Sequence, residues 1–245
     1  MEDFEIMANV ALIIAGGTGA RMGQDIPKQF LTVNDKPIIV YTMEAFENHP
    51  DIDGIVIACL DGWQKALEAF INQFNIRKIK KIVTAGKNGQ DSIRNGVNAI
   101  ADLYNDDDII LVHDAIRPML SGEVITSNIE TCRAKGNAIT VIPCMEAMLR
   151  SDDEVESTES ILRNSLFRAQ TPQTIRVGDM VKLHKEALKK GITNSVATCT
   201  LLLELGHKTY FAKGSELNIK ITTLEDIKIF KALLATKDSA WMKKA

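Results

Sequence analysis

The chain has 245 residues, of which 45% are hydrophobic and 25% charged, with only 15 Gly and 6 Pro. This composition is typical of a globular protein and excludes collagen-like, low-complexity and largely disordered chains. Because 29 Lys and Arg stand against 32 Asp and Glu, giving a net charge of -3, we expect no nucleic-acid partner bound through bulk positive charge.

The sequence gives no sign of export or of membrane insertion. Residues 1–7 carry acids where a secretory signal begins with basic residues. The longest apolar run, at 10–15, is too short to cross a bilayer. No C-x-x-C pair occurs among the cysteines, which is typical of reduced structural thiols: Cys59, Cys132, Cys144 and Cys199. We therefore expect a cytoplasmic protein with no membrane partner.

Short runs rich in β-branched residues predict buried parallel strands at 10–15, 54–58, 109–112 and 138–142. Helical patterns lie between and after them, at 38–48, 63–74, 91–103, 123–135, 177–190, 197–205 and 224–234. Strands that alternate with helices indicate βαβ units with right-handed crossovers. The sequence therefore predicts an α/β fold with one mostly parallel sheet and helices on both faces.

The acidic stretch SDDEVESTES at 151–160 interrupts this regular pattern. It predicts the exposed tip of an excursion that begins after Pro143 and is flanked by residues 145–149 and 161–167. A disordered surface loop is the alternative. Since no internal repeat or Pro/Gly/Ser-rich linker divides the chain, we expect a single domain over residues 8–235.

The glycine-rich stretch AGGTGARMG at 15–23 directly follows the first predicted strand. Glycines let backbone N–H groups converge on an anion, because no Cβ atom is in the way. The spacing matches neither the dinucleotide-binding nor the P-loop fingerprint. Arg21 and Lys28 add a guanidinium and an ammonium next to this turn, which favours a polyphosphate site. A tight strand-to-helix turn with solvated basic residues is the alternative.

Further polar residues follow the later elements. HDAIRP at 113–118 follows a predicted strand, at the edge where open α/β sheets bind ligands. The Asp114 carboxylate can hold a divalent metal ion, or it can cap the next turn and pair with Arg117.

Three other stretches are polar as well. Lys220 lies in a β-branched stretch, NIKITT, that predicts a strand, and a lysine in such a strand needs an anionic partner. Gly86 and Ser92 belong to a loop that enters a helix at Ser92 and can contact a base or ribose. QTPQ at 170–173 is more typical of a turn than of a site.

Together these stretches resemble one family, the cytidylyltransferases of the 2-C-methyl-D-erythritol 4-phosphate type and the related D-ribitol-5-phosphate cytidylyltransferases. The matching motifs occur in the family's order from residue 15 to 226: AGGTGARMG, PKQFL, the Ser92 loop, HDAIRP, RNSLFRAQTPQ and NIKITTLEDI. The resemblance implies a Rossmann-like nucleotidyltransferase fold. It also implies a protruding β-arm at about 143–164 that clasps a second subunit in a homodimer.

The resemblance also implies roles for individual residues. Arg21 and Lys28 would hold the CTP triphosphate and Lys220 would contact the reacting α-phosphate, so these three form the expected catalytic group. Arg163, contributed across the dimer, and Thr171 would bind the acceptor. The expected nucleotide-binding residues are Ala15, Gly16, Gly17, Thr18, Gly19, Gly86, Ser92 and Asp114, of which Asp114 would also lie next to Mg²⁺.

The expected reaction is transfer of CMP from CTP to a sugar-alcohol phosphate, with Mg²⁺ present and pyrophosphate released. The family favours 2-C-methyl-D-erythritol 4-phosphate as the acceptor, and D-ribitol 5-phosphate is the alternative. The chain departs from the family pattern mostly near the acceptor or ribose, at Glu146-Ala147, near Ala197, at Lys87 and at Gly89. A sugar-1-phosphate nucleotidyltransferase that uses UTP or GTP, and a nucleotide-binding module without turnover, are the other hypotheses.

Overall fold

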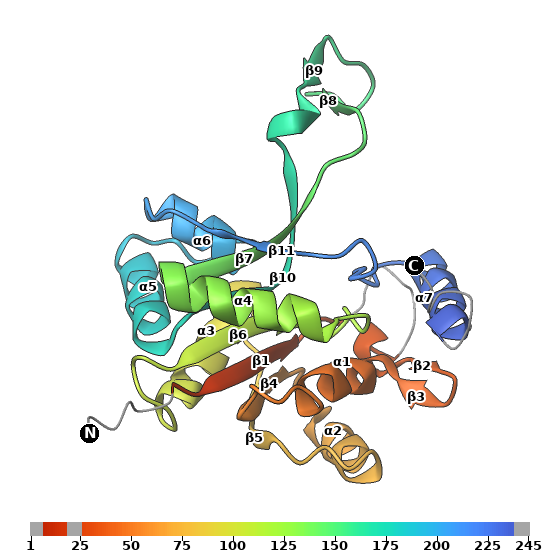
Figure 1. Ribbon diagram of the computed structural model, residues 1–245, viewed down its shortest axis with the longest axis vertical. Helices are drawn as coiled ribbons and strands as arrows, with labels where there is room; N and C mark the ends of the chain where they lie inside the picture. Colours follow the sequence, from red (N-terminus) through yellow and green to blue (C-terminus); the bar gives the residue numbers. More distant parts are fainter. Residues whose placement is uncertain (1–6, 19–25, 238–245) are drawn as a thin grey trace.

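The computed structural model describes residues 7–18 and 26–237. Its centre is a seven-stranded sheet in the order β11-β7-β10-β6-β1-β4-β5 (Figure 1). The strands are β1 (Asn9–Ala15), β4 (Gly54–Cys59), β5 (Ile79–Thr84), β6 (Ile109–Asp114), β7 (Asn137–Pro143), β10 (Phe167–Arg176) and β11 (Phe211–Lys213). All neighbouring pairs are parallel except those of β10, which is antiparallel to both β6 and β7. The predicted α/β fold with a mostly parallel sheet is confirmed.

Helices cover both faces of the sheet (Figure 1). Because successive side chains of a strand point to opposite faces, β1 contributes to two cores. Ala11 and Ile13 pack with one set of helices, and Val10 and Leu12 pack with the other. The first set is α1 (Ile38–Glu47), α2 (Gln64–Gln73) and α4 (Gly122–Lys135), and the second is α3 (Gly89–Ala101), α5 (Val177–Lys189) and α6 (Thr198–Glu204).

The last helix, α7 (Leu224–Lys237), packs at the end of the body near α1. Its Phe230 is fully buried in a small third core with Ile38, Ile116 and Ile221. The helices predicted from periodicity are confirmed, with small differences at their ends. A short hairpin of β2 (Thr32–Val33) and β3 (Lys36–Pro37) precedes α1 and was not predicted.

Other parts of the sheet differ from the predictions. QTPQ at 170–173, predicted as a turn, lies inside β10, where the pairing with β7 shifts between Ala169 and Gln173. β5 was missed because its lysines break the apolar pattern of this edge strand. The strand predicted around Lys220 is wrong, since this segment is irregular. Its Ile221 N–H donates to Ile116 O, just beyond β6, at 2.9 Å. The segment approaches the end of β6 but cannot pair with it, because β1 and β10 already occupy both sides of β6.

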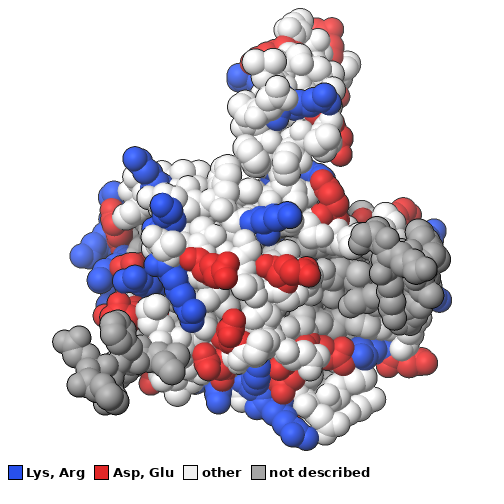
Figure 2. All heavy atoms as spheres, in the orientation of Figure 1, with Lys and Arg blue, Asp and Glu red and all other residues white. Residues whose placement is uncertain are grey.

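Between β7 and β10 the chain leaves the body as a protruding arm (Figure 1). The arm carries β8 (Met148–Arg150), which pairs with β9 (Glu159–Ile161), and the short helix η3 (Arg163–Ser165). Ser151 Oγ donates to Glu156 O at 2.6 Å and so closes the turn at the tip. Figure 2 shows that uncharged side chains cover much of the arm on the face in view. Large apolar side chains stand exposed on it, among them Leu149, Val155 and Leu162, which is typical of an interaction surface.

Two expectations about the whole chain can be compared with the structure. Cys59, Cys132, Cys144 and Cys199 are free thiols, as predicted. Within residues 7–18 and 26–237, no helix combines the length and the hydropathy needed to span a bilayer.

The buried His184 of α5 predicts how stability depends on pH. Neither of its ring nitrogens has a hydrogen-bond partner among the described residues. Burial, with the Arg94 charge nearby, lowers the pKa of His184 to about 4. Because the folded-state pKa lies below the unfolded-state value, the unfolded chain takes up a proton first as the pH falls. The contribution of neutral His184 to the free energy of unfolding is therefore fully present above about pH 6.5 and is lost as the pH falls toward 4.

We expect His184→Met to remove about 3 kcal/mol of the loss in unfolding free energy between pH 6.5 and 4. Urea unfolding at a series of pH values measures this difference. The exposed His207 is the control, since His207→Gln should keep the wild-type pH dependence. The same pH dependence in His184→Met and the wild type would contradict the prediction.

Candidate active site

Two adjoining cavities open at the carboxyl ends of β1 and β6. The first, of about 460 Å³, is lined by the loop after β1, by Lys28, by the segment at 86–92, and by Asp114 and Lys220. The second, of about 320 Å³, is lined by Thr171 and the segment at 196–200, and it shares Asp114 and Lys220 with the first. Ligands bound in the two cavities would therefore meet at this pair of opposite charges.

The structure brings most of the predicted site residues together. The first cavity is lined by Ala15, Gly16, Gly17, Thr18, Lys28, Gly86, Ser92, Asp114 and Lys220. Thr171 lines the second cavity. Arg163 is exposed on the arm, where its Nη1 donates to Met145 O at 2.9 Å, and it lines neither cavity. Gly19 and Arg21 lie outside the described residues.

Close packing and one buried amide hold residues 15–17, where the chain leaves β1. A Cβ atom on Gly16 would lie 2.5 Å from the Ala85 Cβ, so only glycine fits there. The buried Gln29 donates from Nε2 to Ala15 O and to Gly17 O, both at 2.9 Å. Gln29 was missed as a site residue, although it directly follows Lys28 in the sequence. Its place in the motif was the only available signal.

Lys28 reaches the first cavity because the short helix η2 (Lys28–Phe30) is anchored to the core. Phe30 is buried and stacks on Trp63 with ring centroids 4.6 Å apart. Together with Gln29, this contact holds the segment against the end of β1. The aromatic stack thus fixes the backbone from which the lysine extends.

Hydrogen bonds also close the loop between β5 and α3. Asn88 caps the helix, since its Oδ1 accepts from Asp91 N–H at 2.9 Å. Ser92 Oγ accepts from Gly86 N–H at 3.0 Å and donates to Asn88 O at 2.8 Å. The helix therefore begins at Gly89 rather than at Ser92, because Asn88 supplies the cap.

Asp114 holds two cations at the junction of the cavities. Its Oδ2 lies 3.1 Å from Lys220 Nζ and 3.1 Å from Arg117 Nε. Burial raises the pKa of Asp114, but Lys220 and Arg117 together outweigh it and hold the pKa below its usual range. The carboxylate is therefore ionised at neutral pH. The predicted pairing with Arg117 is confirmed, and Lys220 has the anionic partner that the sequence demanded.

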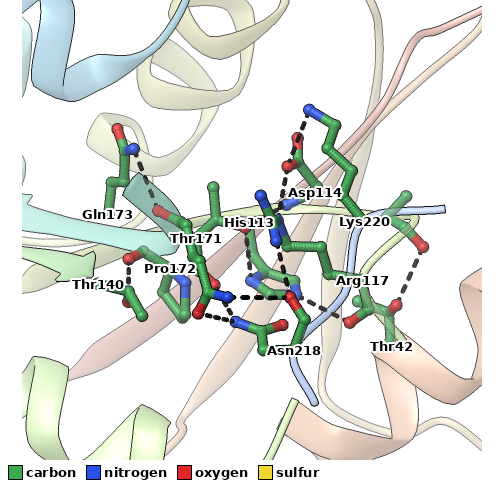
Figure 3. A network of polar contacts seen from close by, with 12 residues as sticks. Thr42, His113, Asp114, Arg117, Thr140, Thr171, Pro172, Gln173, Asn218 and Lys220 are labelled. Carbon is green, nitrogen blue, oxygen red and sulfur yellow. Dashed lines mark hydrogen bonds and ion pairs between the residues drawn. The ribbon is translucent and has the colours of Figure 1, made fainter. Parts of the chain in front are cut away.

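A polar network supports this carboxylate (Figure 3). The Thr171 hydroxyl accepts from Asp114 N–H at 3.1 Å and lies 3.0 Å from His113 Nδ1. His113 Nε2 faces Arg117 O at 3.2 Å, so this nitrogen carries the proton and Nδ1 accepts from Thr171. Burial lowers the pKa of His113 to about 4, so the ring is neutral. Arg117 Nη1 donates to Asn218 O at 2.7 Å, and Asn218 Nδ2 donates to Thr171 O at 2.8 Å.

The network joins three chain segments that are remote in the sequence. The end of β6 and the segment at 217–220 both attach to the irregular part of β10. His113, Arg117 and Asn218 were not predicted as site residues, although they stand in or next to motifs that the sequence analysis identified. Their roles depend on contacts between segments, which adjacency in the sequence does not reveal.

Comparison with known proteins places the chain in a family. The model of the 2-C-methyl-D-erythritol 4-phosphate cytidylyltransferase family matches residues 9–236. The chain belongs to this family. A ribitol-5-phosphate cytidylyltransferase of Lacticaseibacillus paracasei is 41% identical over 230 residues, which cover 93% of this chain and 98% of the relative. A 2-C-methyl-D-erythritol 4-phosphate cytidylyltransferase of Clostridium botulinum is 37% identical over 221 residues, which cover 89% and 94%.

Solved structures agree with this assignment. A 2-C-methyl-D-erythritol 4-phosphate cytidylyltransferase of Francisella tularensis is 26% identical, with a TM-score of 0.76, and 92% of this chain and 99% of that one are covered. A 4-diphosphocytidyl-2C-methyl-D-erythritol synthase of Anaerococcus prevotii, at 22% identity, shares the fold with a TM-score of 0.80 and coverage of 94% and 96%. The family and the Rossmann-like nucleotidyltransferase fold predicted from the sequence are confirmed. The relatives from Lacticaseibacillus paracasei, Clostridium botulinum and Francisella tularensis are named cytidylyltransferases, as predicted.

The Thr171 hydroxyl should contribute measurably to the stability of the network. Thr171→Val keeps the shape of the side chain but leaves His113 Nδ1 and Asp114 N–H without their partner. We expect the free energy of unfolding to fall by about 1–3 kcal/mol, the usual cost of buried unpaired polar groups. Urea unfolding at pH 7 measures this change. Thr171→Ser retains the hydroxyl and should lose clearly less, whereas equal losses would contradict the prediction.

Proposed function

We propose that the protein transfers CMP from CTP to D-ribitol 5-phosphate, forming CDP-ribitol and pyrophosphate. The observation that carries this proposal is the Asp114–Lys220 pair at the junction of two cavities. Glycines and lysines line much of the first, and the second has hydroxyl and amide groups among apolar side chains. The first suits a triphosphate, and the second suits a neutral polyol chain. The name and the 41% identity of the Lacticaseibacillus paracasei relative favour ribitol phosphate as the acceptor.

2-C-methyl-D-erythritol 4-phosphate is the second candidate acceptor. The name of the matched family and the Clostridium botulinum relative favour it. Against it, Ala197 lies in the wall of the second cavity, near the position where enzymes of the methylerythritol type often carry an acidic residue. A polyol phosphate is common to both candidates.

The proposed reaction requires two anions to approach each other. The acceptor phosphate is already a nucleophile at neutral pH, so no general base is needed. Its oxygen forms a bond to the α-phosphorus of CTP while the bond to the β-phosphate bridge breaks and pyrophosphate leaves. Lys28 and Lys220 supply positive charge and alignment where the negative charge develops. Arg21 joins them by resemblance.

The first cavity has a donor set that fits Mg²⁺. Asp114 is the one carboxylate among the described residues that line it, and both of its ion pairs end on Oδ2. One carboxylate together with substrate phosphates is a common set of Mg²⁺ ligands. We propose that Asp114 would hold the ion, which would neutralise charge on the triphosphate when bound.

Release of pyrophosphate tests the proposal. The purified protein is incubated with Mg²⁺, each of the four nucleoside triphosphates, and either ribitol 5-phosphate or 2-C-methyl-D-erythritol 4-phosphate. We expect turnover with CTP and ribitol 5-phosphate. A strong preference for UTP or GTP with sugar 1-phosphates would overturn the proposal. Tight CTP binding without turnover on either polyol phosphate would indicate the binding module instead.

Lys28→Ala should impair catalysis without unfolding the protein. Loss of one cation at the triphosphate should lower kcat by about a hundredfold to a thousandfold, as for the loss of one oxyanion donor. Steady-state kinetics and thermal unfolding measure the two effects. Lys185→Ala, on the exposed side of α5, is the matched control and should behave as the wild type. A wild-type rate in Lys28→Ala would refute its assignment.

We further propose a homodimer in which Arg163 of one subunit completes the acceptor site of the other. Arg163 lines neither cavity of its own chain, and the arm that carries it exposes large apolar side chains such as Leu162. A second copy of the chain would cover this surface and bring the guanidinium to an acceptor phosphate.

Mixing two inactive variants tests this arrangement. Arg163→Ala and Lys220→Met damage different halves of the site, so a mixed dimer has one intact site and one site with both changes. After unfolding and refolding together, random pairing should restore about a quarter of the wild-type activity. Each variant refolded alone should stay nearly inactive, with a raised acceptor KM for Arg163→Ala. No recovery in the mixture would contradict the shared site.

We also propose that the protein acts in the cytoplasm. Its cysteines are all free thiols, as is typical of a reducing compartment. Cell fractionation followed by an assay of the same CTP-dependent pyrophosphate release would test the location.

A further inference from the structure

One wall of the second cavity lies where chain without regular structure enters α6, whose first turn contains Thr198 and Cys199. Residues 190–197 between α5 and α6 belong to no helix or strand. Ala197, Thr198 and Cys199 line the cavity. Such a segment keeps a defined position only when other parts of the molecule hold its backbone.

Gln90 holds the first part of this segment. Its side chain is 2% exposed. The amide Nε2 donates to Ile192 O at 2.8 Å, and Oε1 accepts from Ser195 N–H at 2.7 Å. One neutral side chain thus binds two backbone groups just before the cavity wall.

Gln173 holds the other end. It is 3% exposed, and its Oε1 accepts from Cys199 N–H at 2.8 Å. Its Nε2 donates to Gln170 O at 3.2 Å, which keeps the amide plane oriented within β10. Residues 196–198 therefore lie between two backbone N–H groups, those of Ser195 and Cys199, which donate to buried glutamines of α3 and β10.

The first of these glutamines also ties the wall to the neighbouring cavity. Gln90 follows Gly89, which lines both cavities, and lies in the first turn of α3. Asn88 in the same loop donates from Nδ2 to Thr193 O at 3.0 Å. The loop that borders the first cavity is therefore hydrogen-bonded to the segment that leads into the wall of the second, while its own shape is held by Asn88 and Ser92.

We propose that Gln90 and Gln173 set the affinity for the polyol chain of the acceptor by fixing the wall at 196–199, Gln90 as a positioning residue and Gln173 as a residue that also lines the cavity itself. The inference rests on the proposed function of the second cavity. A neutral polyol is recognised by directional hydrogen bonds, which weaken steeply when donors and acceptors are displaced. Uncharged amides can fix the wall without altering the electrostatic field of Asp114 and Lys220.

Gln90→Met and Gln173→Met test the inference, because methionine keeps most of the volume and removes the amide. We expect each variant to raise the KM for ribitol 5-phosphate by about tenfold or more, as small misplacements in a binding site do. The KM for CTP should stay unchanged, because the Asn88 cap and the contact between Ser92 and Gly86 do not involve these glutamines. Hydrogen exchange should accelerate at the Ser195 amide in the first variant and at the Cys199 amide in the second.

Asn137→Leu is the matched control. Asn137 is buried and holds another loop in the same way, since Nδ2 donates to Lys208 O at 3.0 Å and Oδ1 accepts from Tyr210 N–H at 3.1 Å. It lines neither of the two cavities. This variant should lose stability but keep both KM values. An effect on stability alone in the glutamine variants, as in this control, would show a merely structural role and overturn the inference.

Gln90→Glu gives a second measurement if the methionine variants do not fold. A carboxylate still accepts from Ser195 N–H but cannot donate to Ile192 O, so the acceptor KM should rise while the Ser195 amide stays protected. If the wild type turns over ribitol 5-phosphate, an unchanged acceptor KM in the variant, or an equal rise in the KM values for acceptor and CTP, would overturn the inference. A wild type that turns over no polyol phosphate would instead refute the proposed function, and the inference would fall with it.

Discussion

The site depends on one partly buried carboxylate that holds two cations. Asp114 lies at the end of β6, its side chain 23% exposed, and pairs with Arg117 and Lys220 through a single oxygen. A charge with so little access to water requires opposite charges close by. Because Lys220 belongs to a late segment of the chain, the pairing holds that segment next to the end of β6. The junction of the two cavities follows from this constraint.

The antiparallel strand β10 makes the constraint achievable. It inserts between β6 and β7, so its first half lies at the edge where the parallel strands end. From there Gln170 donates to Ser215 O, Thr171 contacts the end of β6, and Gln173 accepts from Cys199 N–H. Three successive parts of the active-site region thus attach to one irregular stretch of strand. The break in pairing between β10 and β7 leaves these side chains available for such contacts.

Strand β10, which lines the second cavity, also leads out of the arm. The chain leaves β7, forms the β8–β9 hairpin and returns through η3 into β10 (Figure 1). Any partner that covers the apolar surface of the arm would therefore be linked through continuous backbone to Thr171 and the second cavity. The proposed homodimer and the proposed acceptor site share this structural basis.

The sequence alone determined the layers, the glycine-rich loop, the family and most of the residues around the first cavity. The layers could be predicted because buried parallel strands are continuous apolar runs, and the edge that holds the site because the ends of parallel strands meet there. The family and the roles of single residues came from the resemblance of the motifs. Tertiary structure alone decided that Lys220 lies in an irregular segment, that QTPQ belongs to β10, and that Gln29, Gln90 and Gln173 hold loops. A buried amide has no periodic signature in the sequence, since its partners are backbone groups that only the folded chain brings within reach.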